Sequence, residues 1–410
     1  MAATVTSIAQ RGRRGKRPRP GSWHALLALT AAVTLSGCQT LLPRGEPQAP
    51  RSVPDARPAP RPVPPVQPQA NVLPQDRQRH RVALLVPTTG ADAAIGQSIA
   101  DAANMAVLDT GGDTIRVTIY DTGPGARAAA ERALIDGAEL ILGPLLSDNV
   151  REVAPLADAR KVPIVAFTND VETAAPGVFV MGFTPTQSVG RVISYAATQG
   201  AKRFAILAPQ GTYGDRSTSS FVAAVRDAGG RIVSTQRYSA SQPSVNAAAR
   251  ALVAAGAVDA VMIADSGRSA VAIVPALKKA GVGSPMILGT ELWNTERSLR
   301  SNPDFDGALF ASVSDTLYEQ LATKYRDRYA RAPYRLSSLG YDAVLLATKI
   351  ARDWKPDSRF PLNELLDTGG FAGIDGAFRF AQGPVAERAL EVKRLGGGAE
   401  RVVDPAPTRF

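Results

Sequence analysis

The chain has 410 residues, 45% of them hydrophobic, which is ample for two lobes with hydrophobic cores, and its single cysteine excludes an internal disulfide. The net charge of +10 does not indicate a nucleic-acid partner, because the first 37 residues carry +6, residues 38–79 carry +3, and only +1 is left for residues 80–410.

The N-terminus has the pattern of a secretory signal peptide. Six basic residues precede an apolar stretch at residues 23–37, which is too short to span a bilayer comfortably, since a spanning helix needs ~20 apolar residues. The stretch ends in Leu35-Ser36-Gly37-Cys38, which resembles the bacterial lipobox. The resemblance implies a lipoprotein signal peptide at residues 1–37, cleavage before Cys38 and acylation of this cysteine. An ordinary signal peptide with a chance cysteine is the alternative.

Residues 38–79 are predicted to be a disordered, proline-rich tether that begins at the lipidated cysteine. Eleven prolines fall between Pro43 and Pro74, and without apolar periodicity the segment favours extended polyproline II over a packed core. About 40 residues at ~3.1 Å each reach on the order of 120 Å when fully extended. A spacer that holds a domain away from a membrane suits an exported chain better than an SH3-type ligand does.

From Arg81 onward, short apolar runs rich in β-formers alternate with helical patterns. This alternation predicts parallel sheets with right-handed crossovers. In a first unit we expect strands at residues 81–86, 115–120, 139–142, 162–167 and 178–183, and helices at 92–109, 125–136, 148–160 and 185–199.

The same pattern restarts after residue 200 and predicts a second unit of similar size. We therefore expect an α/β fold with two Rossmann-like lobes and a cleft between them, lobe 1 comprising residues 80–200 with about 314–353 and lobe 2 residues 201–313 with about 354–403. The expected strands are 203–208, 231–238, 258–264 and 286–289, the helices 215–228, 244–255 and 269–280, followed by helices at 314–329 and 337–353 and a β-rich tail at 373–380 and 389–395.

Polar residues follow the predicted strands, at the edge where open parallel sheets bind ligands. Hydroxyls and backbone amides at helix N-termini suit a carboxylate or another small anion, an acid across the cleft suits an ammonium, and an aromatic ring covers an apolar body. Ordinary helix capping and turn formation are the alternative roles for such residues. The ligand-binding candidates are Thr89, Ser147, Thr168, Asn169, Tyr213, Asp265 and Glu291.

Catalysis is poorly supported by the residues. The two histidines, His24 and His80, lie in the signal peptide and at the domain edge, which removes a Ser–His–Asp triad, a Cys–His pair and histidine-based zinc sites from the folded part. Phosphate-binding, dinucleotide-binding and nucleophile-elbow motifs are absent from the sequence. A carboxylate pair in the cleft, with Asp265 and Glu291 as candidates, is the remaining option. We expect no enzyme, no metal and no cofactor.

Three runs carry a family resemblance: residues 82–90, 136–144 and 161–167, supported by Tyr213-Gly214 and residues 337–343. With them, the segment from about residue 81 to 395 resembles the type I periplasmic binding-protein fold, in the branch of leucine-, isoleucine- and valine-binding receptors. Within that fold, Gly143-Pro144-Leu145-Leu146 and Gly182-Phe183-Thr184-Pro185 resemble the penicillin-binding protein activator lipoproteins.

The chain departs from both groups. The activators carry an additional N-terminal helical-repeat domain, where this chain has only the tether. Amino-acid receptors place serines and small residues after the third strand, where Leu145 and Leu146 stand here.

The resemblance implies a periplasmic lipoprotein that regulates peptidoglycan synthesis by contacting a penicillin-binding protein. Gln39 follows the cysteine in place of the aspartate that retains lipoproteins at the inner membrane, so we expect an anchor in the inner leaflet of the outer membrane. The alternative is a solute receptor that delivers a leucine-type amino acid or a related small molecule to an ABC permease.

Overall fold

The computed structural model describes residues 79–407, which lie in one compact unit, Val72–Phe410. The expected signal peptide, Cys38 and all of the tether except Arg79 lie outside the described residues. No helix within residues 79–407 is long and apolar enough to cross a membrane.

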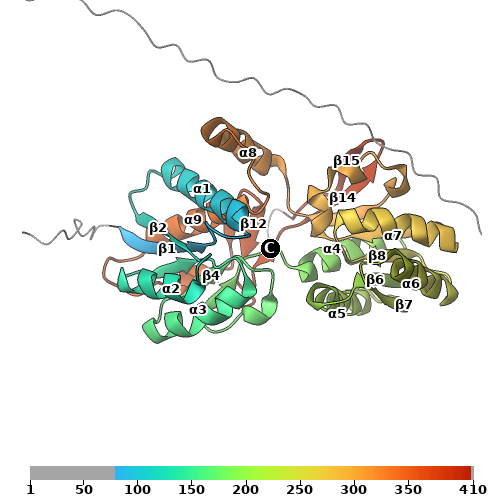
Figure 1. Cartoon of the computed structure of the whole chain (residues 1–410), viewed down its shortest axis with the longest axis horizontal. Helices are drawn as coiled ribbons and strands as arrows, with labels where there is room; N and C mark the ends of the chain where they lie inside the picture. The colour runs from blue at the N-terminus through green and yellow to red at the C-terminus, as the bar shows by residue number, and fades with distance from the viewer. Residues whose placement is uncertain (1–78, 408–410) are drawn as a thin grey trace, which may run out of the picture. The chain divides into compact units, whose positions relative to one another are not determined.

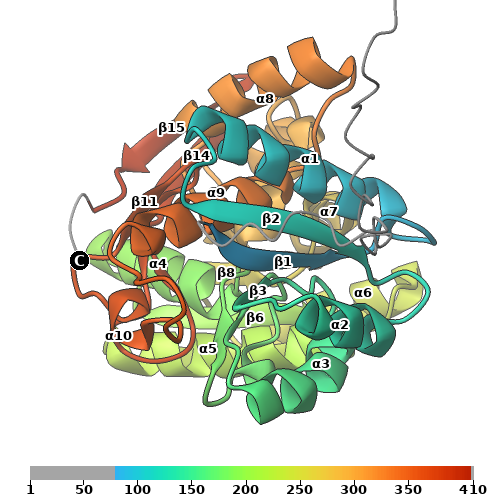
Figure 2. The same cartoon turned by 90° about the vertical axis from the view of Figure 1, so that its left-hand side faces the viewer.

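A parallel five-stranded sheet forms the centre of the first lobe (Figures 1 and 2), with the strand order β2-β1-β3-β4-β5. Val82 of β1 pairs with Val117 on one side and with Leu140 on the other. Along β1, alternate side chains join two different hydrophobic clusters, so both faces of this sheet are buried. The strands are β1 (His80–Val86), β2 (Ile115–Asp121), β3 (Leu140–Leu142), β4 (Ile164–Ala166) and β5 (Val178–Val180).

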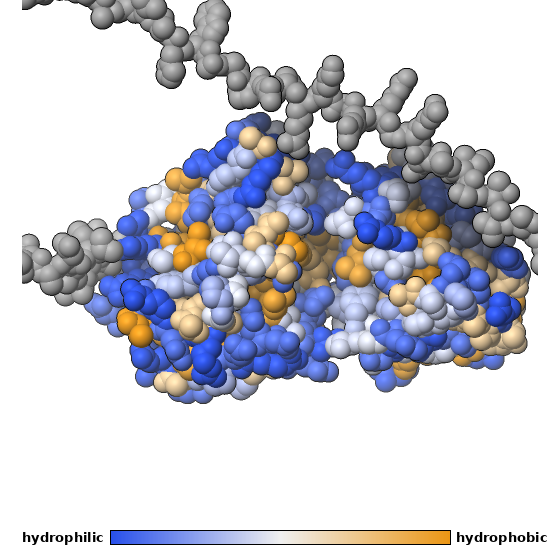
Figure 3. All heavy atoms as spheres, viewed as in Figure 1, coloured by the Kyte–Doolittle hydropathy of each residue, from blue (hydrophilic) through white to orange (hydrophobic). Residues whose placement is uncertain are grey.

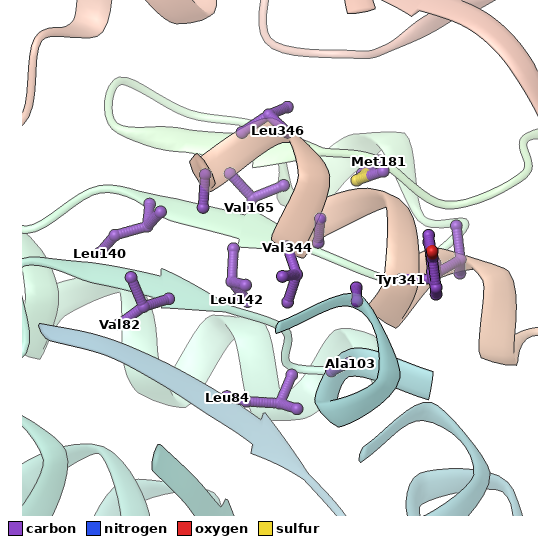
Figure 4. Packing of buried hydrophobic residues seen from close by; sticks show 14 of the residues in the cluster. Val82, Leu84, Ala103, Leu140, Leu142, Val165, Met181, Tyr341, Val344 and Leu346 are labelled. Atoms are coloured by element: carbon purple, nitrogen blue, oxygen red, sulfur yellow. The ribbon is translucent and has the colours of Figure 1, made fainter. Parts of the chain in front are cut away.

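Helices cover both faces of this sheet (Figure 2). On one face Val82 and Leu84 belong to the same hydrophobic cluster as Ala103 of α1 and Val344 of α9, which Figure 4 shows from close by. The other face is covered by α2 and α3, through a cluster that contains Leu85. The helices of this lobe are α1 (Ala93–Asp109), α2 (Ala126–Ile135), α3 (Ser147–Arg160), α8 (Thr316–Tyr329), α9 (Ser337–Ala351) and α10 (Leu362–Leu365), with the 3-10 helix η1 (Val171–Thr173).

The second lobe is built on a seven-stranded sheet with the order β15-β14-β10-β9-β8-β6-β7. Strands β6 to β10 are parallel, whereas β14 runs antiparallel to β10 and β15 antiparallel to β14. The strands are β6 (Arg203–Pro209), β7 (Arg231–Tyr238), β8 (Ala260–Ile263), β9 (Met286–Gly289), β10 (Leu309–Ser312), β14 (Glu391–Gly396) and β15 (Ala399–Asp404).

Two pairs of helices enclose the second sheet. Helices α4 (Pro185–Thr198) and α5 (Thr212–Asp227) share one hydrophobic cluster with it, and α6 (Gln242–Ala254) and α7 (Gly267–Ala280) share another. Three short 3-10 helices follow β9: η2 (Glu291–Thr295), η3 (Arg297–Leu299) and η4 (Pro303–Phe305). The expected α/β fold with parallel sheets is therefore confirmed.

The chain passes between the lobes three times, between β5 and α4, between β10 and α8, and between β13 (Glu387–Arg388) and β14. Two boundaries differ from our expectation. Helix α4, expected in lobe 1, packs on the second sheet through Val189, Val192 and Ile193. Residues 354–388, expected in lobe 2, pack in the first lobe, because buried aromatic side chains such as Trp354 and Phe378 join its core.

The β-rich tail is also divided differently from the prediction. Residues 371–388 form a small three-stranded sheet of β11 (Phe371–Gly373), β12 (Gly376–Arg379) and β13, which belongs to the first lobe. Only β14 and β15 extend the second sheet. Strands β10 and β15 were not expected.

Candidate functional site

A cavity with a volume of about 410 Å³ lies between the two lobes. The first lobe contributes the loops after β3 and β4 and the region before α9, and the second contributes the start of α4 and helix η2. Figure 3 shows that the surface is indented where the lobes meet, with apolar side chains beside the indentation. Apolar residues form much of the cavity wall, among them Ile95, Leu145, Leu146, Phe167, Phe183 and Leu336.

Glu291 is the acid that the second lobe places in this cavity, because η2 begins directly after β9. The Ser188 hydroxyl on α4 donates a hydrogen bond to Glu291 Oε2. The Tyr213 hydroxyl lies 3.2 Å from Glu291 Oε1 and 3.0 Å from Thr290 Oγ1. Burial raises the pKa of Glu291, and the hydrogen bonds from Ser188 and Tyr213 oppose this effect. The carboxyl group is thus held by its own lobe.

Arg335 is the cation in the cavity wall. Its Nη1 lies 2.6 Å from Asp375 Oδ1, and its Nη2 lies 3.3 Å from Asp315 Oδ1. The guanidinium also stacks over the ring of Tyr318, 4.1 Å from its centroid. Burial lowers the pKa of Arg335, but the neighbouring Asp375 and Asp315 more than offset this and keep it above its usual value. The charge of Arg335 is therefore matched within the chain.

Asp315 lies in the segment between β10 and α8 and connects Arg335 to the second lobe. The buried Lys393 on β14 lies 2.6 Å from Asp315 Oδ2 and 2.9 Å from Asn294 Oδ1. Burial raises the pKa of Asp315, while the Lys393 and Arg335 charges lower it by more, and the net shift is downward. One network of charges thus runs from the cavity wall through a connecting segment into the second sheet.

Two of the seven ligand-binding candidates, Asn169 and Glu291, line the cavity. Tyr213 reaches it indirectly through its contact with Glu291. Ser147 begins α3 and follows Leu146, which lines the cavity.

The other three candidates have local structural contacts. The Thr89 hydroxyl donates to Asp121 Oδ2 at 2.6 Å, and Thr168 Oγ1 accepts the Asp170 N–H at 3.1 Å. Asp265 accepts a hydrogen bond from the Tyr238 hydroxyl at 2.6 Å and lines a different cavity, beside β7. Turn formation, one of the alternative roles noted above, describes Thr168, whereas Thr89 contacts a side chain at the end of the neighbouring strand β2.

Several polar residues of the cavity were not predicted from the sequence, because the candidates were taken from the residues that follow predicted strands and these residues lie elsewhere. Gln187 and Ser188 lie on α4, which was assigned to the other lobe, and Arg335 lies in the segment before α9. Within the part of the chain that the structure describes, no group of three or more His, Cys, Asp and Glu residues is arranged to hold a metal ion.

A family described as periplasmic binding protein matches residues 80–399. The chain belongs to this family. Periplasmic binding proteins of known structure have the same fold: a putative branched-chain amino acid ABC transporter protein from Rhodospirillum rubrum superposes with a TM-score of 0.69 at 20% identity, over 79% of this chain and 100% of that one. A solute-binding protein from Rhodopseudomonas palustris, in complex with 3,4-dihydroxybenzoic acid, has a TM-score of 0.61 at 18% identity, over 81% and 99%.

Among curated relatives, the penicillin-binding protein activator LpoA of Edwardsiella ictaluri is 24% identical over 73% of this chain and 50% of its own length. The chain thus spans half of that relative, and it spans only 38% of an uncharacterised Rickettsia prowazekii protein to which it is 30% identical over 141 residues. Membership of the periplasmic binding protein family, with relatives among the activators, indicates a periplasmic, non-catalytic binding or regulatory protein.

Proposed function

We propose that this periplasmic binding protein is a penicillin-binding protein activator, which regulates peptidoglycan synthesis through direct contact with the synthase. The observation that carries the proposal is that Arg335 and Glu291, two charged groups of the cleft, already have partners in the chain. Arg335 is paired with Asp375 and Asp315, and Glu291 accepts hydrogen bonds from the side chains around it. The similarity to an activator over 73% of the chain supports the same conclusion.

These pairings disfavour a free amino acid in the cleft. An amino-acid zwitterion needs a cation for its carboxylate and an acceptor for its ammonium group. A ligand carboxylate would compete with Asp375 and Asp315 for the Arg335 guanidinium. Leu145 and Leu146, in the cavity wall, add no polar group. A surface for a protein partner involves no such competition.

In this proposal the chain is anchored in the outer membrane by an acylated Cys38, and residues 39–78 connect the anchor to the two lobes. A tether of this length reaches on the order of 120 Å when fully extended. That reach lets a domain at one membrane contact a synthase at the other side of the periplasm.

The test is reconstitution with a bifunctional penicillin-binding protein from the same cell envelope. We expect the purified chain to increase the rate of glycan polymerisation or of cross-linking, and to recover the synthase in a pull-down. Heat-denatured chain serves as the control. An unchanged rate together with no recovered synthase would refute the proposal.

A solute receptor is the second candidate, favoured by one observation: the cleft is large and mostly apolar at about 410 Å³, within the usual range of small-molecule pockets. A solute with a large apolar body suits this wall better than a small polar amino acid does, and the Rhodopseudomonas palustris protein binds an aromatic one, 3,4-dihydroxybenzoic acid. Calorimetry with leucine, benzoate and dihydroxybenzoate tests this candidate, and absence of heat at millimolar ligand would remove it.

A further inference from the structure

An ion pair joins the two lobes beside the cleft. Arg216 lies on α5 of the second lobe, and its Nη2 is 2.6 Å from Asp170 Oδ1 and 3.3 Å from Glu172 Oε2 in the first lobe. Asp170 caps η1 and follows Asn169, a residue of the cavity wall. Figure 1 shows α5 in one lobe and α3, the helix before β4, in the other. The pair therefore connects the lobes at the rim of the cavity.

Asp170 is held by guanidinium groups from both lobes. Arg151 on α3, in its own lobe, lies 2.6 Å from Asp170 Oδ2, while Arg216 contacts Oδ1. The Glu172 N–H donates to Oδ1 as well, at 3.0 Å. The Asp170 side chain is only 6% exposed and that of Arg216 18% exposed, so solvent and salt screen this contact less than an ordinary surface pair.

Separating the lobes would break the ion pairs of Arg216 with the first lobe. Asp170 would keep Arg151 but lose Arg216, and Arg216 would leave the two acids that it contacts. Burial raises the pKa of Asp170, but Arg216, the Glu172 N–H and Arg151 lower it by more, and the carboxylate stays ionised at neutral pH. The three segments that connect the lobes lie elsewhere in the sequence, near residues 182, 314 and 390. The ion pair thus joins the lobes at a place where no connecting segment of the chain does.

We propose that Arg216 and Asp170 form a latch that holds the two lobes in one fixed arrangement and limits opening of the cleft. The latch consists of the chain's own side chains, so it operates whether the cleft binds a solute or the outer surface binds a synthase. The inference is independent of the proposed function, because its test needs neither partner.

The test is the distance between two spin labels, one on each lobe, measured by pulsed electron paramagnetic resonance. The chain has a single cysteine, so Cys38→Ala leaves a background free of thiols. Ala159→Cys on α3 and Ala247→Cys on α6 place the labels at exposed positions of the first and second lobes. In this background, Arg216→Ala is expected to lengthen and broaden the distance distribution.

Arg151→Ala is the matched control, because it removes the other guanidinium from the same carboxylate without affecting the interlobe contact. We expect its distances to equal those of the parent. Arg216→Gln keeps most of the side-chain volume without the charge, and it should reproduce the effect of Arg216→Ala. A parent-like distribution in both Arg216 variants would overturn the latch. So would an equal broadening in Arg151→Ala, since the contact would then act within the first lobe.

Discussion

The carboxyl group of Asp342 on α9 accepts hydrogen bonds from two backbone N–H groups of the β11–β12 turn, that of Ile374 at 2.6 Å and that of Asp375 at 3.4 Å. Both aspartate side chains are fully buried. Burial and the nearby charge of Asp375 raise the pKa of Asp342 to about 7, although Arg388 and the two N–H groups act in the opposite direction. Two acids thus share one buried site in the first lobe.

This site predicts a loss of stability as the pH rises. An aspartate in the unfolded chain has a pKa of about 3.9, so between pH ~4 and ~7 the folded state retains a proton on Asp342 that the unfolded state has lost. The stabilisation from this group is complete below pH ~4 and is lost as the pH rises through the folded pKa, by about 1.4 kcal/mol per unit at most. Asp342→Asn should remove that slope in urea denaturation between pH 4 and 7. Asp148→Asn, at an exposed position on α3, should leave the slope in place, and an unaltered slope in Asp342→Asn would contradict the assignment.

The hydrogen bond from Tyr213 to Glu291 predicts a shift in a cleft titration. Tyr213→Phe removes a donor that favours the ionised carboxylate, so the pKa of Glu291 should rise further above its usual value. Carbon-detected NMR of labelled glutamate carboxyl groups measures it directly. Tyr238→Phe is the control, since its hydroxyl bonds Asp265 in the same lobe but outside this cavity. A Glu291 midpoint that stays the same or falls in Tyr213→Phe would show that the contact does not stabilise the charge.

The buried Lys393 predicts a large stability effect. Its Nζ is 2.6 Å from Asp315, 3.3 Å from Glu400 and 3.4 Å from Glu391, and its side chain is 3% exposed. Lys393→Met leaves these acids without their shared cation, and we expect a loss of about 3–5 kcal/mol in the free energy of unfolding at pH 7.

The matched control for that change is Lys278→Met, which breaks an exposed pair with Asp304 at 2.9 Å. Exposed pairs contribute about 0–1 kcal/mol, so this variant should unfold close to the parent in urea. Equal losses of unfolding free energy in the two variants would mean that the buried Lys393 contacts stabilise the fold no more than an exposed ion pair does.

Two helical glycines predict changes of opposite sign. A Cβ atom at Gly96 on α1 would lie 1.9 Å from the Pro87 carbonyl oxygen, whereas one at Gly190 on α4 would meet no atom within 4 Å. Gly96→Ala must therefore displace α1 from the end of β1, and it should destabilise the fold by about 1–3 kcal/mol. Gly190→Ala should stabilise it by about 0.5–1 kcal/mol, because alanine loses less backbone entropy in a helix. Thermal unfolding of both variants measures the contrast, and a stabilised Gly96→Ala would contradict the close approach.

The alternation of strands and helices was predictable because it is a local pattern. Assignment to a lobe was not, because the apolar face of α4 would cover either sheet, and only the three-dimensional path places Val192 on the second one. Strand β10, Leu309–Ser312, was missed because short 3-10 helices, and no α-helix, separate it from β9, so it falls outside the alternation of strands and α-helices.

The same distinction applies to the candidate site. Asn169 and Glu291 were found because they follow strands β4 and β9, and the carboxyl ends of parallel strands meet at one edge. Arg335 was missed because it lies in the connection between α8 and α9 and does not follow a strand. Its role depends on Asp315 and Asp375, which come from two further parts of the chain.

The repeated passage of the chain between the lobes has a consequence for synthesis. Helix α1 packs against α9. During synthesis α1 therefore lacks this partner until residues 185–312 of the second lobe and α8 have left the ribosome. Bringing together two helices so far apart in the sequence costs loop-closure entropy, which slows folding. Until they meet, the apolar face of α1 stays exposed. A truncated product that ends after β10 would therefore expose the apolar face of α1 that α9 covers in the complete fold.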